Sequence, residues 1–283
     1  MASVGSLLAA SALPRHEAQS LLELAAGLDR VAQVTHPERI LSAQQVALVQ
    51  ALFARRCSGE PLAYMLGERE FWGLAFKVNP AVLIPRPETE LLVELALERL
   101  PLQQAARVLD LGTGSGAVAV AVAHERPGID LTAVDVSADA LAVARVNALR
   151  HGACIAFAQG DWFAALAGRS GMRFDLILGN PPYIAAADPH LAQGDLPHEP
   201  AQALAAGPDG LEAIRRIVAQ AGSHLAPGGW LLLEHGFDQE SACRALFEQA
   251  GFAEIRTWRD LAGLPRVTGG RLDAQIDAGQ VER

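Results

Sequence analysis

The sequence RVLDLGTGSG, residues 107–116, decides the fold of this chain. Its apolar first half predicts a buried strand, and its glycine-rich second half predicts a tight turn. The Ala-rich run 117–124 predicts a helix whose N-terminus faces a ligand held at the turn. A second strand, 131–134, ends at Asp135, about where an acidic residue binds ribose hydroxyls. This pattern predicts a nucleoside-binding unit within an α/β sheet.

The glycine turn alone leaves two cofactors open. Gly112, Gly114 and Ala117 satisfy the relaxed G-x-G-x-x-G/A pattern of NAD-binding proteins, which is a weak match. Two features favour S-adenosylmethionine over NAD. The turn reads G-x-G-x-G, and a later turn suits an amide substrate, which an NAD-dependent hydride transfer would not need. We expect Asp110 to lie near the ammonium group of the methionine part. Asp161 and Trp162, which follow the predicted strand 155–158, are expected to hydrogen-bond and stack with the adenine. The full predicted set for the cofactor is Asp110, Gly112, Thr113, Gly114, Ser115, Gly116, Asp135, Asp161, Trp162 and Asn180.

The later turn is Asn180-Pro181-Pro182-Tyr183, directly after the apolar run 174–178. The Asn180 side chain offers a carbonyl acceptor, and Pro181 offers a backbone carbonyl on a stiff frame. Two such acceptors can hold both N–H bonds of a planar NH2 group, and the Tyr183 ring can lie against its face. We therefore predict catalytic roles for Asn180, Pro181 and Tyr183, and substrate contact for these three and Pro182. The alternative is a proline-rich turn that only closes a strand.

Composition indicates a cytoplasmic enzyme. The chain has 283 residues, 51% of them hydrophobic, enough for one large core and a small second domain. It has no long uncharged apolar run and no signal-like start, so we expect no membrane partner. Its three cysteines and eight histidines show no ligand-type spacing, and we predict no metal.

The order of patterns divides the chain. Helix-period apolar patterns broken by prolines fill residues 1–75 and predict a small helical domain for substrate recognition. Residues 76–87 read as a connector, possibly a β-hairpin, with two strands between 71 and 83 and a turn at Asn79-Pro80. Strands then alternate with helices over 88–272, the predicted methyltransferase domain, and 273–283 form a tail. A final strand is expected at 267–272.

These motifs resemble the release-factor glutamine methyltransferases over residues 1–272. The resemblance implies a seven-stranded, Rossmann-like class I methyltransferase sheet with one antiparallel strand, preceded by the helical domain. It also implies methylation of N5 of the glutamine in the Gly-Gly-Gln loop of class-1 peptide chain release factors. It leaves open the roles of Arg86, Glu88, Glu90 and Glu199. The matching segments are 59–61, 69–73, 83–90, 110–116, 161–163, 180–184, 199–200 and 231–236.

Two other functions share these features. Similar Asn/Asp-Pro-Pro-Tyr turns occur in methyltransferases that act on exocyclic amines of nucleobases in RNA or DNA. Those enzymes approach a polyphosphate, which favours a basic surface, whereas this chain carries a net charge of −9. We expect no direct nucleic-acid partner and a monomer. A non-enzymatic binding module is disfavoured because both sites look complete.

Overall fold

The predicted unit around the glycine turn is present in the computed structural model, which describes residues 2–100, 102, 105–168 and 171–273. Strand β3 (Arg107–Leu111) runs into the turn, helix α7 (Ala117–Glu125) follows, and β4 (Asp130–Asp135) lies parallel to β3. The buried Val and Leu side chains of β3 explain why this short run becomes a central strand.

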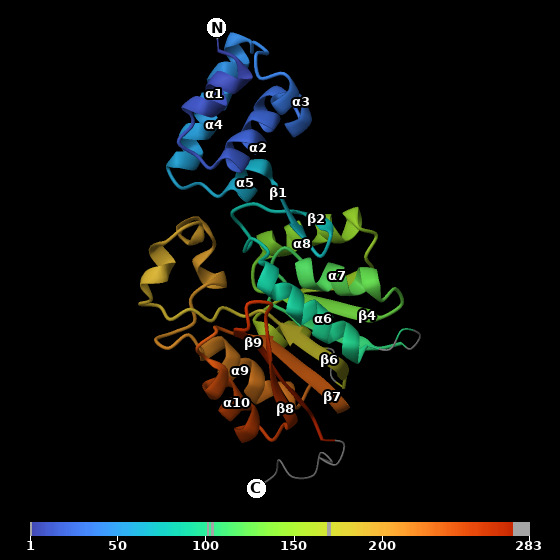
Figure 1. Cartoon of the computed structure of the whole chain (residues 1–283). Helices are drawn as coiled ribbons and strands as arrows, with labels where there is room; N and C mark the ends of the chain where they lie inside the picture. Colours follow the sequence, from blue (N-terminus) through green and yellow to red (C-terminus); the bar gives the residue numbers. More distant parts are fainter. Residues whose placement is uncertain (1, 101, 103–104, 169–170, 274–283) are drawn as a thin grey trace.

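Seven strands form one sheet in the order β5-β4-β3-β6-β7-β9-β8 (Figure 1). The other strands are β5 (Ile155–Gln159), β6 (Phe174–Gly179), β7 (Leu225–Glu234), β8 (Ala253–Arg259) and β9 (Pro265–Arg271). Strand β9 covers most of the predicted final strand 267–272, and it runs antiparallel to both of its neighbours, so it is the one antiparallel strand that the resemblance implies. The chain leaves β3 towards β4 and β5, then returns to place β6 on the other side of β3. Ligands of open α/β sheets bind at such a reversal, at the carboxyl ends of the strands.

Helices cover both faces of the sheet. Helices α6 (Glu90–Arg99), α7 and α8 (Ala138–Arg150) lie on one face, and α9 (Glu212–Ala221) and α10 (Glu240–Gln249) lie on the other. Strand side chains alternate accordingly: Leu176 and Leu178 pack towards α6 and α7, whereas Ile177 packs towards α9. Each fully buried side chain of this kind contributes roughly 1.5–3 kcal/mol.

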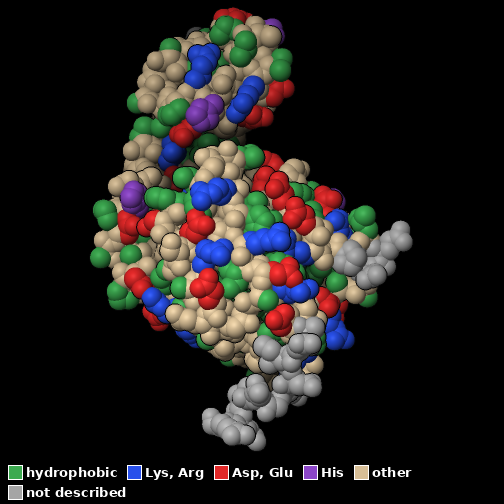
Figure 2. Space-filling view, turned by 60° about the horizontal axis from the view of Figure 1, so that its bottom comes forward, with side chains coloured by type: hydrophobic (Ala, Val, Ile, Leu, Met, Phe, Trp, Pro, Cys, Tyr) green, Lys and Arg blue, Asp and Glu red, His purple; other side chains and the backbone are tan. Residues whose placement is uncertain are grey.

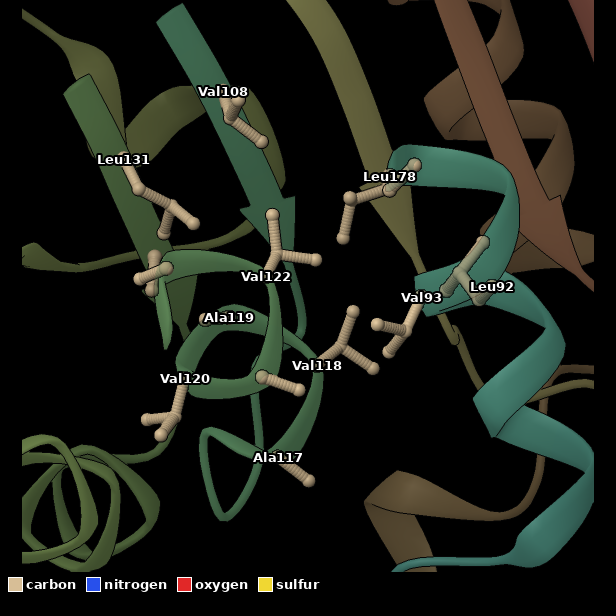
Figure 3. Packing of buried hydrophobic residues seen from close by; sticks show 14 of the residues in the cluster. Leu92, Val93, Val108, Ala117, Val118, Ala119, Val120, Val122, Leu131 and Leu178 are labelled. Atoms are coloured by element: carbon tan, nitrogen blue, oxygen red, sulfur yellow. The ribbon is translucent and has the colours of Figure 1, made fainter. Parts of the chain in front are cut away.

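Helix α7 is buried on all sides, which its sequence AVAVAVA allows. Figure 3 shows Val118 and Val122 between the β3 residue Val108, the β6 residue Leu178 and the α6 side chains. The small alanines let the helix lie close to the sheet. This packing fixes the helix N-terminus, and with it the glycine turn.

The first part of the chain folds into helices with a core of their own. These are α1 (Val4–Ala10), α2 (Arg15–Ala26), α3 (Arg30–Thr35), α4 (Ala43–Cys57) and α5 (Leu62–Leu66). A capping box between Ser42 and Gln45 begins α4. Figure 1 shows this helical group at one end of the molecule, beyond the hairpin. Its buried residues include Val4, Leu7, Leu22, Leu28, Leu41 and Val49.

The predicted hairpin lies earlier than expected. Strands β1 (Glu68–Phe71) and β2 (Leu74–Lys77) pair antiparallel, so the two-stranded hairpin is present but β1 ends where the predicted range 71–83 begins, and the predicted connector 76–87 contains only the end of β2. The turn is Trp72-Gly73, with φ of 55° and 69°, the paired positive φ that a two-residue hairpin loop requires. Asn79 instead makes a local turn in which its side chain accepts from the Ala81 N–H at 2.9 Å.

Short 3-10 turns occupy several connections near the carboxyl edge of the sheet. They are η1 (Pro87–Thr89), η2 (Trp162–Leu166), η3 (Pro189–Ala192), η4 (Leu196–His198) and η5 (Ala201–Ala203). Residues 274–283 of the predicted tail lie outside the described residues. Among the described helices, none has the length and apolar character needed to cross a membrane.

Candidate active site

The glycine turn after β3 is held in a conformation that glycine favours. Gly112, Gly114 and Gly116 have φ of 73°, 56° and 81°. The N–H groups of Gly112 and Thr113 both donate to the Val134 carbonyl at 2.9 Å, which ties the turn to β4. A Cβ on Gly112 would come within 3.2 Å of the Trp162 ring, so the missing side chain makes room for the indole.

Asp135 ends β4 and supports the turn from the side. Its Oδ2 accepts from the Gly114 N–H at 2.8 Å, and its Oδ1 accepts from the Ser137 N–H at 2.9 Å. Both oxygens are acceptors with further lone pairs, and the residue lines the cavity described below. Asp135 is therefore placed to meet hydroxyl donors of a bound ligand.

Asp110 is a fully buried carboxyl at the end of β3. It accepts a hydrogen bond from the Thr113 hydroxyl at 2.6 Å. Burial raises its pKa to about 7, against the lowering effect of that hydrogen bond, and the nearby charge of Asp135 also raises it. A cation brought next to this carboxyl would stabilise its ionised form.

One cavity of about 1020 Å³, open mouth included, joins these features. Most of the predicted cofactor residues line it, and so does Pro182. Gly116 does not line it: it lies against Ala144, to which a Cβ would come within 3.1 Å, so its role is close packing of two helices. The predicted residues in the lining are Asp110, Gly112, Thr113, Gly114, Ser115, Asp135, Asp161, Trp162 and Asn180.

Asp161 and Trp162 differ in how free they are to meet a ligand. The Asp161 carboxylate forms an ion pair with Arg216 of α9, and both side chains are about half exposed. An exposed pair of this kind contributes little to stability. Trp162 has a left-handed φ of 50° that turns its ring onto the glycine loop. The position of the Trp162 indole is therefore more firmly fixed than that of the Asp161 carboxylate.

Asn180 follows β6 and faces the same cavity. Its side-chain Nδ2 donates to the Thr89 hydroxyl oxygen at 3.2 Å. Because the NH2 end is bound in this way, the Oδ1 end is left for an incoming donor. Pro181 is buried and does not line the cavity, although its carbonyl belongs to the same rigid turn.

Tyr183 does not line this cavity but lines a second hollow, whose lining shares Arg86 with that of the cavity. Its hydroxyl donates to Glu234 Oε1 at 3.3 Å, and burial raises its pKa. Glu234, at the end of β7, is 1% exposed, and burial raises its pKa to about 7. The second hollow is lined by Arg86, Glu88, Tyr183, His190, Gln193, Gly194, Asp195, Leu196, Glu234 and Arg266.

A loop after the Asn180 turn contributes Pro200, Gln202 and Ala203 to the lining of the cavity. Glu199, whose side chain is fully buried, forms an ion pair with Arg86 and accepts from the Ile84 N–H at 3.1 Å. Asp195 forms an ion pair with Arg56 of α4 at 3.3 Å. The loop 185–204 thus contacts both the segment before α6 and the helical group.

The chain matches two family models, the PrmC N-terminal domain over residues 2–67 and the methyltransferase small domain over residues 88–207. Release factor glutamine methyltransferases of Bordetella pertussis and Escherichia coli are 51% and 48% identical to it. The alignments span 96% and 94% of this chain, and 100% and 95% of those proteins. The chain belongs to the release factor glutamine methyltransferase family.

Solved structures support the fold of this family member. A methyltransferase from Pyrococcus furiosus has a TM-score of 0.54 at 18% identity, covering 79% of this chain and 99% of that one. A 16S rRNA methyltransferase of T. thermophilus, solved with AdoMet and guanosine, has a TM-score of 0.53 at 21% identity, covering 72% and 49%. Both confirm the class I methyltransferase sheet.

The cofactor of the enzyme is S-adenosylmethionine, and the cavity fits such a molecule. A buried carboxyl with a raised pKa suits an ammonium group, a positioned indole suits an adenine, and the Asp135 oxygens suit ribose hydroxyls. The same three chemical groups belong to S-adenosylmethionine.

Sequence reasoning missed several residues that surround the site. Thr89 lines the cavity and Glu234 lines the second hollow, although both lie in segments that carried the family resemblance. A sequence pattern could have pointed to both residues, because Thr89 is a polar residue at a helix entry and Glu234 is a polar residue at the end of an apolar run. Glu90 also gains a role, because its Oε1 accepts from the Trp72 N–H at 2.9 Å and holds the hairpin to α6.

Proposed function

We propose that this enzyme methylates the side-chain amide nitrogen, N5, of the glutamine in the Gly-Gly-Gln loop of class-1 peptide chain release factors. The observation that carries the proposal is the orientation of Asn180. Its NH2 end donates to Thr89, so its carbonyl oxygen remains for an N–H donor at the edge of the cofactor cavity. A carbonyl in this position suits a primary amide.

The Asn180 turn supplies the means to hold that amide. Asn180 Oδ1 and the Pro181 carbonyl would each accept one of its two N–H bonds, which directs the nitrogen lone pair towards the cofactor cavity. An amide nitrogen is a poor nucleophile because its lone pair is delocalised into the carbonyl. Fixed orientation therefore makes a large contribution to the rate.

The same two acceptors stabilise the charge that develops on the nitrogen. S-adenosylmethionine supplies a methyl group bonded to a positively charged sulfur. As the nitrogen gains positive charge, its N–H bonds become stronger donors to the two carbonyls, which are already in place. Neither carbonyl is basic enough to remove a proton first, so the extra proton leaves to water afterwards. Tyr183, held by Glu234, would pack against the amide plane.

The protein surface supports a protein substrate over a nucleic acid. The net charge is −9, and in Figure 2 the Lys and Arg side chains are interspersed with Asp and Glu over the face that is shown. A polyphosphate would favour a continuous basic surface. The helical domain, residues 1–75, is proposed to recognise the release factor, and the resemblance of residues 2–67 to the PrmC N-terminal domain supports this role.

Substitution of Asn180 tests the proposed role of its side chain. Asn180→Ala should lower the rate of methyl transfer to a release factor about 10²–10³-fold, the range for losing one preorganised hydrogen-bond partner. Asn180→Asp keeps an acceptor of the same size and should retain more activity than Ala. Single-turnover transfer of labelled methyl gives the rates, and calorimetry gives the cofactor affinity, which should change little. Equal activity of Asn180→Ala and the unaltered enzyme would contradict the assignment.

A further inference from the structure

The proposed function depends on which end of the Asn180 side chain faces the substrate. The two ends of an amide are almost the same size, but only the oxygen can accept from a glutamine N–H. If the side chain turned over, an NH2 group would face the substrate NH2, and two donors would oppose each other. Some feature of the site must therefore fix this orientation.

Thr89 is the hydrogen-bond partner of Asn180 and lies in the turn that enters α6. It is 5% exposed, and its hydroxyl oxygen accepts from Asn180 Nδ2 at 3.2 Å. A hydroxyl can donate as well as accept, so Thr89 alone would bind either end of the amide. The direction of the Thr89 hydroxyl proton therefore decides which end of the Asn180 amide it binds.

Glu234 provides the acceptor that orients this proton. The Tyr183 hydroxyl donates to its carboxyl, the Thr89 hydroxyl lies close to the same carboxyl, and both lower its pKa against the effect of burial. Oε1 accepts from Tyr183, whereas the buried Oε2 has no hydrogen-bond partner among the described residues, so it is the acceptor left for the Thr89 hydroxyl. The pKa of this carboxyl is about 7, so above pH 7 it is ionised and only accepts, and a hydroxyl beside it must then donate.

We propose that Thr89 and Glu234 are positioning residues that fix the direction of the Asn180 amide. In this chain of contacts Thr89 donates to Glu234, Asn180 Nδ2 donates to Thr89, and Asn180 Oδ1 faces the substrate. The proposal rests on the proposed function, because it concerns how the acceptor for the glutamine amide is held. Both residues are proposed to act through Asn180, and neither is assigned a contact with the reacting atoms.

Replacing the Thr89 hydroxyl tests this. Thr89→Val has a similar shape without the hydroxyl, and it should lower kcat by about 10-fold to 100-fold, as expected for a misdirected catalytic group, with KM for S-adenosylmethionine little changed. Thr89→Ser keeps the hydroxyl, so its kcat should lie between those of Thr89→Val and the unaltered enzyme, and nearer to the latter. Thr132→Val is the matched control, since Thr132 is also buried but lies in β4 away from both cavities.

A double-mutant cycle shows whether Thr89 acts through Asn180. In an Asn180→Ala background, Thr89→Val should cost little further activity, because the group that it orients is gone. A full additional loss there, or a loss in Thr89→Ser equal to that in Thr89→Val, would overturn the proposal. If Thr89→Val does not fold, Thr89→Ala replaces it in both tests.

A measurement on the enzyme without substrate separates this inference from the proposed function. The Asn180 side-chain NH2 resonances, identified by their loss in Asn180→Ala, should exchange slowly with solvent in the unaltered protein and faster in Thr89→Val. Fast exchange in the unaltered protein would overturn the inference even if release factors are methylated. Slow exchange without any methylation of a release factor would overturn the proposed function and leave the inference standing.

Discussion

At the scale of single residues, the buried carboxyl of Asp110 makes cofactor binding depend on pH. Its pKa is raised to about 7, so in the free enzyme it holds a proton below pH 7 and is ionised above it. The ammonium of S-adenosylmethionine favours the ionised form, so binding releases a proton on the acid side. Affinity should therefore rise with pH towards 7, by at most about tenfold per unit, and level off above it.

Calorimetry between pH 5.5 and 8.5 measures this profile, and Asp110→Asn provides the control. The neutral variant should bind more weakly and with a flatter pH dependence. The charge of Asp135 also acts on the Asp110 carboxyl. The dependence of affinity on pH must therefore disappear in Asp110→Asn for it to be assigned to Asp110. A flat profile in the unaltered enzyme, or an equal slope in Asp110→Asn, would show that Asp110 does not meet the ammonium.

At the scale of elements, the loop 185–204 depends on Glu199. Its buried carboxylate holds Arg86 and the Ile84 N–H, so Glu199→Gln removes the charge and leaves Arg86 without its partner. Losing one member of a buried pair is costly, about 3–5 kcal/mol where both are fully buried, and less here because Arg86 is 30% exposed. We expect faster backbone hydrogen exchange in 185–204 and a higher KM for the release factor.

Hydrogen exchange by mass spectrometry follows the loop directly, and Glu248→Gln on α10 is the control because that side chain is exposed. Exchange in β3 and α7 should stay the same in both variants. If Glu199→Gln leaves the loop as protected as Glu248→Gln does, the ion pair does not hold the loop.

Elements with local signals could be predicted from the sequence, and those fixed by distant contacts could not. The glycine turn and the Asn180 turn each follow an apolar strand, and the sheet brings them together at the reversal beside β3. The hairpin was misplaced because Asn79-Pro80 gave a stronger turn signal than Trp72-Gly73, where a tryptophan adopts a positive φ. The Arg86–Glu199 pair joins residues 113 positions apart, and no local pattern reports such a contact.

At the scale of the whole molecule, the helical domain should matter for the protein substrate and little for the cofactor. It has its own core, and the cofactor cavity is lined by residues after position 80. A protein that begins at Glu68 should bind S-adenosylmethionine with similar affinity and methylate a release factor far more slowly. Calorimetry confirms that the shortened protein is folded, and a time course of methyl transfer gives the rate. Full activity would mean that the helical domain serves another purpose.

The most direct test of the whole account is to find where the methyl group goes. A release factor, the same factor with its Gly-Gly-Gln glutamine changed to alanine, and ribosomal RNA are each incubated with enzyme and labelled S-adenosylmethionine. Tandem mass spectrometry of the unaltered factor should place one methyl group on the side-chain nitrogen of that glutamine, and the other two substrates should stay unlabelled. Label on the alanine variant, or a preference for RNA over the factor, would contradict the account.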